Sequence, residues 1–241
     1  MNVNTDTNEL NNNINEKIEN NNANIMKKLG HFFNVTIYVH FFKRIFDILG
    51  GIVGFIILIP LTIIVFFANL INKDKGPLFY SQKRIGKKGR VFKIYKFRSM
   101  IVGASDILKQ YLDEHPDEKK EFTKYRKLKH DPRITKTGTF LRKTSLDEWP
   151  QFVNILKGDM SLIGPRPLAI GELDDYNGDH NTYEKIRPGL TSLWSINGRS
   201  NLDYDERLKL EYEYVNSVSF TQDLKIILKT VQIVLKRDGA V

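Results

Sequence analysis

One uninterrupted apolar run dominates the hydrophobic pattern of this chain. From Ile48 to Leu70, 23 consecutive positions carry no charged residue, and such a run is long enough to cross the roughly 30 Å hydrocarbon layer of a bilayer as a helix. Lys43 and Arg44 precede the run, and six further lysines and arginines follow it between residues 73 and 88. The pattern therefore predicts a membrane-associated helix.

The charges around this run bear on how the helix sits in the membrane. Lysine and arginine favour the cytoplasmic side, so basic flanks at both ends indicate that both ends face the cytoplasm. Pro60 lies near the middle of the run, where it removes a backbone hydrogen bond and favours a break. Each half-helix would span about 15 to 20 Å at 1.5 Å per residue, enough for one leaflet. We therefore expect a re-entrant, Pro-broken helix over about residues 45–71; an ordinary crossing with a proline kink is the alternative.

Short β-prone runs and charged helical segments follow. Residues 78–85 and 91–97 flank the glycine-rich sequence GKKG, and this pattern predicts a β-hairpin. The basic residues of 83–90 also fit a solvated strand beside an anionic membrane surface. Residues 101–130 are heavily charged and have a helical pattern, with a break at Pro116.

The segment from Ser145 to Gly158 carries the signals of a helix. Ser145 and Glu148 match the capping-box pattern. Pro150 suits the first turn, and Gly158 is placed to end the helix. Asp147 and Glu148 then lie at the helix start, where unpaired amides and the helix dipole favour ionised carboxylates. Capping and catalysis are compatible roles for this acidic pair.

Apolar residues recur at helical spacing once more near the C-terminal end of the chain. Packing against a core is the preferred explanation of this stripe, and a basic amphipathic helix lying in the membrane interface is the alternative. Its members are Leu224, Ile227, Leu228, Val231, Val234 and Leu235.

Composition narrows the class of protein. Residues 1–24 contain eleven asparagines and few large apolar groups, so we expect them to be a disordered leader. The chain has no cysteine, which excludes a disulfide framework and thiolate metal sites. A net charge of +9 indicates an anionic partner, and nucleic acid, acidic lipid and nucleotide phosphates all qualify. A membrane-tethered nucleic-acid binder is disfavoured, because aromatic and basic residues are not interleaved at a stacking spacing.

Basic residues near the acidic pair are candidates for holding an anion. Arg142 lies five residues before Asp147 and could supply an opposite charge, although it could equally balance Glu148 as a surface ion pair. Arg166 lies between two prolines that restrict the backbone. A fixed guanidinium suits a bidentate grip on phosphate; a rigid connector whose arginine faces water is the alternative.

Lys96 and Arg98 lie on or just beyond the second strand of the predicted hairpin, and Arg98 is flanked by apolar neighbours. We expect both to contact substrate. His115 and His130 have no partners at a metal-ligand spacing, so surface positions are expected for them.

Several long motifs occur together in a fixed order. They are GPLFYSQKRIG, KFRSM, DPRITKTGTFLRKTSLDEWPQ, GDMSLIGPRP and RPGLTSLWSINGR. Over about residues 40–237, this set closely resembles the bacterial monotopic phosphoglycosyl transferases, also called the bacterial sugar transferase family. The multi-pass membrane region of the larger family members has no counterpart here, so we expect the minimal catalytic form.

The resemblance implies a reaction and roles for individual residues. A phosphosugar would move from a UDP-sugar to polyprenyl (undecaprenyl) phosphate, giving a polyprenyl diphosphate sugar and UMP. Asp147 would be the nucleophile of a covalent aspartyl-phosphosugar intermediate, and Glu148 would help to hold Mg²⁺. Arg142 and Arg166 would lie around the phosphates. Trp149 stands where leucine is common in the family, which changes bulk beside the pair and not its charge.

The expected fold class is α+β and mainly helical. It combines an N-terminal re-entrant membrane helix, a small β-hairpin and amphipathic interfacial helices around a compact catalytic domain. We expect the leader over residues 1–24, the membrane-associated segment over 25–72, and a cytoplasmic phosphoglycosyl transferase domain over 73–241.

Further expectations concern contacts and location. Arg133 and Arg199 are additional candidates for phosphate or substrate contacts, as is Arg187, although surface roles fit Arg187 and Arg199 equally well. We expect the inner leaflet of the bacterial cytoplasmic membrane as the location and no nucleic-acid partner; a homodimer is compatible with the sequence. A non-catalytic membrane-anchored scaffold is the main alternative, and it would tolerate amides in place of Asp147 and Glu148.

Overall fold

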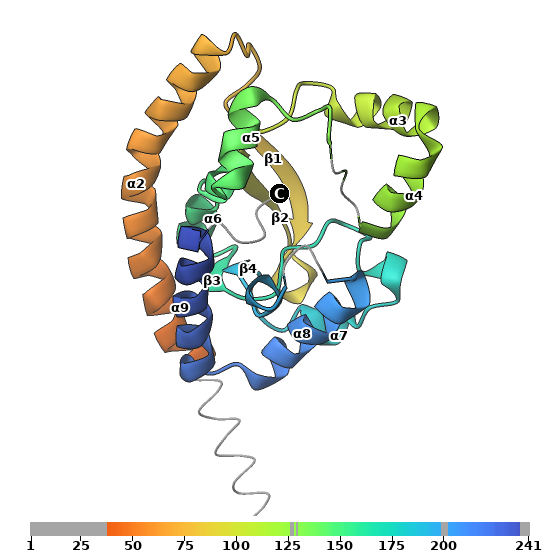
Figure 1. The fold of residues 1–241 in the computed structure, drawn as a ribbon. Coiled ribbons are helices and arrows are strands. Elements are labelled where there is room, and N and C mark those ends of the chain that lie inside the picture. Colours follow the sequence, from red (N-terminus) through yellow and green to blue (C-terminus); the bar gives the residue numbers. More distant parts are fainter. Residues whose placement is uncertain (1–37, 126–127, 129, 199–201, 237–241) are drawn as a thin grey trace, which may run out of the picture.

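The computed structural model describes residues 38–125, 128, 130–198 and 202–236 (Figure 1). The predicted leader over 1–24 and the candidate Arg199 lie outside the described residues. The helices are α2 (Lys43–Ile71), α3 (Ala104–Glu114), α4 (Pro116–Tyr125), α5 (Lys136–Lys143), α6 (Gln151–Lys157), α7 (His180–Tyr183), α8 (Tyr204–Ser217) and α9 (Phe220–Lys236). The strands are β1 (Phe79–Ile85), β2 (Val91–Phe97), β3 (Ser161–Ile163) and β4 (Gly189–Thr191). This mainly helical architecture with one small antiparallel hairpin and one long apolar helix agrees with the predicted class.

The predicted β-hairpin is confirmed. Strands β1 and β2 pair antiparallel, from Phe79 opposite Phe97 to Ile85 opposite Val91. A short 3₁₀ turn, Lys87–Gly89, connects them where the sequence has GKKG. The break at Pro116 is also confirmed, since α3 ends at Glu114 and α4 begins at that proline. Strands β3 and β4, which pair in parallel, were not predicted.

Helix α2 lies along one side of the body over its whole length (Figure 1). One line of its residues is buried at helical spacing: Lys43, Asp47, Gly51, Gly54, Leu58, Val65 and Asn69. At Gly54 the helix approaches α6 so closely that an added Cβ would lie 2.2 Å from the Phe152 ring. The remaining faces are apolar and exposed, and among the described residues α2 is the one helix long and apolar enough to cross a membrane.

Both ends of α2 are bonded to the same body. At the N-terminal end, Lys43 forms a buried ion pair with Asp223 of α9, and the Arg44 guanidinium donates to the last carbonyls of α6 at 2.7 and 2.9 Å. Just beyond the C-terminal end, the Asn72 amide donates to Thr137 Oγ1 of α5 at 3.2 Å. The basic residues that precede the apolar run are therefore held by protein groups.

Helix α2 continues through Pro60. The predicted break at this proline is not seen as an interruption of the helix, and the re-entrant topology stays a prediction. The structure adds one constraint on the topology, which is that both ends of α2 contact the same folded body.

The apolar stripe of α9 does not pack into the core as preferred from the sequence. Leu228 is 63% exposed, and Leu224, Ile227, Val231 and Val234 are exposed as well. A neighbouring face of α9 packs into the core instead, and Ile226 on that face is fully buried. Helix α9 lies beside the N-terminal part of α2 (Figure 1), with the rings of Phe46 and Phe220 5.8 Å apart. The exposure favours the alternative, an interfacial helix.

Hydrophobic clusters join the long helix to the hairpin. Leu58 and Val65 of α2, Phe97 of β2 and Leu141 of α5 form one buried group. A second group joins Phe92 and Ile94 of β2 to Ile155 of α6 and to Met160. Leu146 and Trp149, in and beside the turn between α5 and α6, pack against the first cluster, and this turn carries the acidic pair.

The buried ion pair between α2 and α9 can be tested by thermal unfolding. Replacing Asp223 by asparagine leaves the Lys43 ammonium in a buried position without its counter-charge, which typically costs about 3 to 5 kcal/mol. We expect Asp223→Asn to lower the melting temperature in detergent clearly. Lys225→Gln, an exposed position two residues along the same helix, is the control. Equal melting temperatures for the two variants would contradict the stabilising role of the pair.

Candidate active site

The acidic pair lies in a 3₁₀ turn, Leu146–Glu148, between α5 and α6. The predicted capping box is wrong. Ser145 adopts a left-handed conformation with φ 57° and makes no capping hydrogen bond, whereas a capping residue needs an extended backbone for its hydroxyl to reach the first turn. Helix α6 begins later, at Gln151, with Pro150 at its N-cap. The chain therefore reverses sharply at Ser145 and presents the two carboxylates on a tight turn.

The other end of α6 is as predicted, and a buried amide fixes the helix to the hairpin. Gly158 ends the helix with φ 83°. The fully buried Asn154 donates to Lys93 O at 2.7 Å and accepts from Tyr95 N at 3.0 Å. An amide is able to make both bonds because it carries a donor and an acceptor, like a strand backbone. Asn154 was missed by the sequence analysis, since an asparagine within an apolar helix has no distinctive pattern.

The contact between α6 and the hairpin brings Lys96 of β2 close to the acidic pair. Lys96 Nζ lies 2.5 Å from Glu148 Oε1, and both side chains are partly exposed. No sequence spacing predicts this contact, because 52 positions separate the two residues. Lys96 is thus one predicted site residue that the structure places at the pair.

The pKa of Asp147 differs from the sequence-based expectation. Partial burial raises it to about 6; Glu148 also raises it, while Lys96 and Arg142 lower it. Desolvation disfavours the charged form of a carboxyl group. At pH 7, a carboxyl group with this pKa is still about nine-tenths ionised. Asp147 is thus available as a carboxylate at neutral pH without the helix-start stabilisation expected from the sequence.

Arg142 of α5 lies close enough for its charge to act on Asp147. Its Nε donates to Ser99 Oγ at 3.0 Å. The loop at Ser99 and helix α5 approach so closely at Gly138 that an added Cβ would lie 2.0 Å from Ser99 O. Close packing therefore sets the position of Arg142 beside the pair.

Arg98 and Arg133 are committed to local structure. Arg98 is 5% exposed and donates to Pro77 O, Met100 O and Asp74 Oδ1. Arg133 makes a two-bond contact with Asp131, at 2.7 and 2.6 Å. Their phosphate-binding roles stay predictions, and these contacts give them no support.

Arg166, in the GPRP sequence, is fixed on three sides. Its backbone N–H donates to Glu211 Oε1 at 2.9 Å, its carbonyl accepts from Tyr183 at 2.7 Å, and its guanidinium donates to Glu172 Oε1 at 2.8 Å. The side chain remains 34% exposed. Arg166 is therefore not a connector residue whose guanidinium only faces water, because that group pairs with Glu172.

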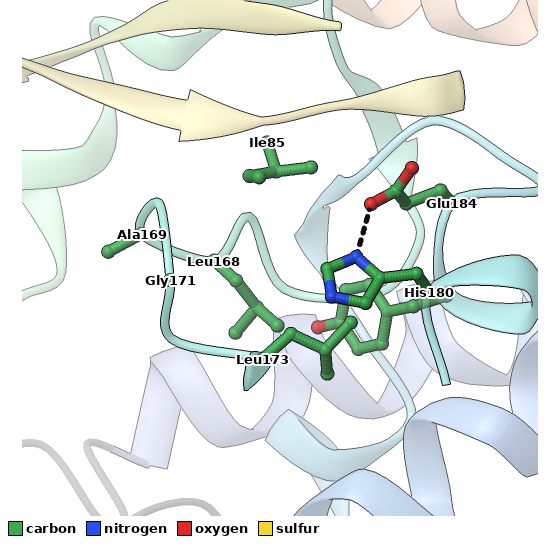
Figure 2. Close-up of a pocket in the computed structure, with 8 residues that line it drawn as sticks. Ile85, Leu168, Ala169, Gly171, Leu173, His180 and Glu184 are labelled. Atoms are coloured by element: carbon green, nitrogen blue, oxygen red, sulfur yellow. Dashed lines mark hydrogen bonds and ion pairs between the residues drawn. The ribbon is translucent and has the colours of Figure 1, made fainter. Parts of the chain in front are cut away.

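Two hollows lie away from the acidic pair. Figure 2 shows one below the loop that follows GPRP, with apolar side chains such as Ile85, Leu168 and Leu173 and a hydrogen bond between His180 and Glu184. Its volume of about 10 Å³ admits at most a water, so it is not a substrate pocket.

The second hollow, of about 270 Å³, lies at the hairpin turn. Four of its lining residues are basic: Lys87, Lys88, Arg90 and Arg187. Arg187 donates to Gly158 O at 2.8 Å, which is a structural role at the end of α6.

The carboxylates of the acidic pair fit one mode of metal binding. No group of three or more His, Cys, Asp or Glu side chains gathers as a metal site among the residues that the structure describes, and His115 and His130 are exposed, as expected. Mg²⁺ commonly keeps several waters and takes only one or two carboxylates together with substrate phosphates. Glu148, with its side chain 40% exposed, fits that mode.

Comparison with known proteins shows the family of this chain. Residues 38–237 match the family model described as "Bacterial sugar transferase". The chain is 46% identical over 200 residues to an undecaprenyl-phosphate galactose phosphotransferase of Salmonella typhimurium, covering 83% of this chain and 42% of that relative. It is 47% identical over 199 residues to the galactosyl transferase CpsE of Streptococcus agalactiae, covering 82% and 43%. It is 40% identical over 198 residues to the exopolysaccharide production protein ExoY of Rhizobium meliloti, covering 82% and 87%. The chain thus spans about two fifths of the first two relatives.

The electrostatic role of Lys96 can be tested by titration. Because its positive charge lowers the pKa of Asp147, Lys96→Ala should move the titration of Asp147 to higher pH. Carbon NMR of protein labelled at aspartate carboxyls measures this change. Lys93→Ala, an exposed position on the same strand, should leave the titration in place. An unchanged or lowered Asp147 pKa in Lys96→Ala would contradict the arrangement.

Proposed function

The chain belongs to the bacterial sugar transferase family, and from that membership we propose that it transfers a phosphosugar from a UDP-sugar to polyprenyl phosphate. The products are a polyprenyl diphosphate sugar and UMP. The observation that carries the proposal is the turn at Asp147 and Glu148, where a partly buried carboxylate adjoins Lys96 and Arg142. The name of the Salmonella typhimurium relative, an undecaprenyl-phosphate galactose phosphotransferase, supports the same class of reaction.

Asp147 acts as the nucleophile in this proposal. One of its carboxylate oxygens attacks the phosphorus that carries the sugar, and the bond from that phosphorus to the bridging oxygen of UMP breaks. An oxygen of polyprenyl phosphate then attacks the same phosphorus, and the aspartyl bond breaks to restore the carboxylate. Splitting the transfer in this way lets a soluble donor and a lipid acceptor use one site in turn.

The basic residues around the pair oppose the repulsion between a carboxylate and a diphosphate. Lys96 and Arg142 act on Asp147, and Arg166 presents a guanidinium on a fixed backbone. Pre-placed positive charge lowers the barrier to attack on a negatively charged phosphoryl group. Mg²⁺, held by Glu148 and substrate phosphates, would neutralise further phosphate charge when bound.

The long helix would set the height of the site above the membrane. A straight helix of 29 residues is roughly 43 Å long at 1.5 Å per residue, more than the hydrocarbon layer of about 30 Å. Both of its ends are bonded to one body whose surface is charged. A crossing helix would carry part of that body through the bilayer. We therefore propose that both ends of α2 stay on the cytoplasmic side, with the exposed apolar faces of α2 and the exposed stripe of α9 in the same membrane interface.

A non-catalytic scaffold would also use a membrane helix and a basic surface. The scaffold explanation gives no reason for a partly buried carboxylate near a lysine and an arginine. Burying a carboxylate costs free energy, and carboxyl groups with shifted pKa values cluster at functional sites. The transferase is therefore the better explanation. One relative is named for galactose, and another, 38% identical over 198 residues, is a UDP-glucose:undecaprenyl-phosphate glucose-1-phosphate transferase of Klebsiella pneumoniae. A panel of UDP-sugars therefore identifies the donor sugar.

The nucleophile assignment is tested by UMP release. Purified protein with Mg²⁺, polyprenyl phosphate and a panel of UDP-sugars should release UMP, and Asp147→Asn should reduce the rate at least about a thousandfold, because an amide is a far weaker nucleophile. Asp205→Asn, an exposed carboxylate on α8, should keep the full rate. Release at the wild-type rate by folded Asp147→Asn would refute the assignment.

The topology is tested by labelling from outside the cell. Single cysteines at Lys27, before α2, and at Lys75, after it, should both resist an impermeant thiol reagent in intact cells and react after the membrane is opened. Labelling of one position alone in intact cells would favour a full crossing and contradict the proposed topology.

A further inference from the structure

Three guanidinium groups from three segments converge on one carboxylate, Glu172. Arg84 of β1 lies 3.4 Å from its Oε2, Arg166 of the GPRP loop lies 2.8 Å from its Oε1, and Arg207 of α8 lies 3.7 Å from the same oxygen. The backbone N–H of Ala169 also donates to Oε2 at 2.8 Å. Of these residues, the sequence analysis singled out only Arg166.

The single carboxylate of Glu172 is a poor hydrogen-bond partner for three guanidinium groups. Hydrogen bonds between a guanidinium and an anionic oxygen are usually about 2.7 to 2.9 Å long, and two of the three contacts to Glu172 exceed that length. Arg84 Nε and Arg207 Nη2 are buried and have no hydrogen-bond partner among the described residues. Donors that are buried in this way are costly unless something accepts from them.

The balance of charge is also uneven. Glu211, the second carboxyl group nearby, is fully buried, and burial raises its pKa to about 8, so it is largely uncharged at neutral pH. Glu172 then supplies one negative charge to three guanidinium groups. The surplus suits an anion with more charge than a carboxylate and with three oxygens in place of two.

Arg84 links the cluster to the acidic pair electrostatically. The charges of Arg166, in the cluster, and of Glu148, in the pair, both act on the pKa of Arg84. The cluster is also reachable, because the side chains of Arg166 and Glu172 are 34% and 21% exposed. Arg207 is stacked against aromatic rings, with Trp194 at 4.6 Å and Tyr204 at 5.3 Å, which fixes its plane.

We propose that Arg84, Arg166 and Arg207 form the subsite for the nucleotide phosphate, and that Glu172 occupies this subsite as an internal anion until the nucleotide displaces it. The inference rests on the proposed function and deepens it. Its chemistry is recognition of a phosphate monoester or diester by guanidinium forks. UMP, the proposed leaving group, carries such a phosphate, and so does the lipid acceptor.

Binding of UMP, without turnover, tests the subsite. Glu172→Gln keeps a side chain of the same shape and removes the competing charge, so UMP should bind about tenfold more tightly, a difference of about 1.4 kcal/mol. Arg207→Lys keeps the charge and loses the planar fork, so UMP should bind at least about tenfold more weakly. Lys209→Gln, an exposed position on the same helix, should change nothing. Calorimetry in detergent gives the dissociation constants, and melting temperatures are recorded in parallel.

A purely structural ion cluster predicts a different result. Both variants would then melt at lower temperature while the dissociation constant for UMP stayed within about twofold of wild type, and this result would overturn the proposal. Should Glu172→Gln fail to fold, Arg207→Lys and wild type still decide: UMP should raise the melting temperature of wild type and not that of the variant. An equal rise in both overturns the proposal.

Two further features of the experiment distinguish failure of the proposed subsite from failure of the proposed reaction. Farnesyl phosphate, a short polyprenyl phosphate, replaces UMP in the same titrations; variant effects on farnesyl phosphate alone would overturn the assignment to the nucleotide. The binding measurements use no catalysis, so they report on the subsite even if UMP release from every UDP-sugar were absent. Failure of the subsite and failure of the proposed reaction are thus distinguishable.

Discussion

Helix α6 is held between the apolar helix α2 and strand β2, and the position of the acidic pair depends on this contact. Gly54 lets the ring of Phe152 approach the α2 backbone, and the Trp149 indole N–H donates to Gly54 O at 2.9 Å. On the opposite side, Asn154 pairs with the backbone of β2. The turn that precedes α6 therefore has little freedom, and its carboxylates keep a set distance from the long apolar helix α2.

The charged groups at the N-terminal end of α2 complete this attachment. Arg44 satisfies the carbonyls at the end of α6, Asp47 accepts from Ser161 Oγ and Leu162 N at the start of β3, and Lys43 pairs with Asp223. Charges with so many partners are able to remain within protein beside an apolar environment. The proposed reaction requires the nucleophile at the level of the lipid headgroups, and this attachment is a physical means of fixing that level.

Local features of the fold could be predicted because short-range chemistry determines them. The hairpin around GKKG, the break at Pro116 and the helix end at Gly158 all follow from backbone preferences of glycine and proline. The capping box failed at Ser145, where the backbone is left-handed, a conformation that local propensity did not indicate. The α9 stripe was assigned to the core because amphipathic periodicity does not distinguish a protein core from a membrane interface. Contacts over long separations, such as Lys96 with Glu148 or Arg84 with Glu172, left no pattern in the sequence. The proposed roles of Asp147 and Glu148 came from the resemblance of the long motifs to the family, because no local spacing indicates a nucleophile.

Mass spectrometry of the protein itself tests the central claim most directly. The protein is mixed with Mg²⁺ and a UDP-sugar in the absence of polyprenyl phosphate, quenched with acid and digested. The account predicts a peptide that contains Asp147 with the added mass of one sugar phosphate, which disappears when polyprenyl phosphate is added before the quench. An adduct on another residue, or active protein that never carries an adduct, would contradict it.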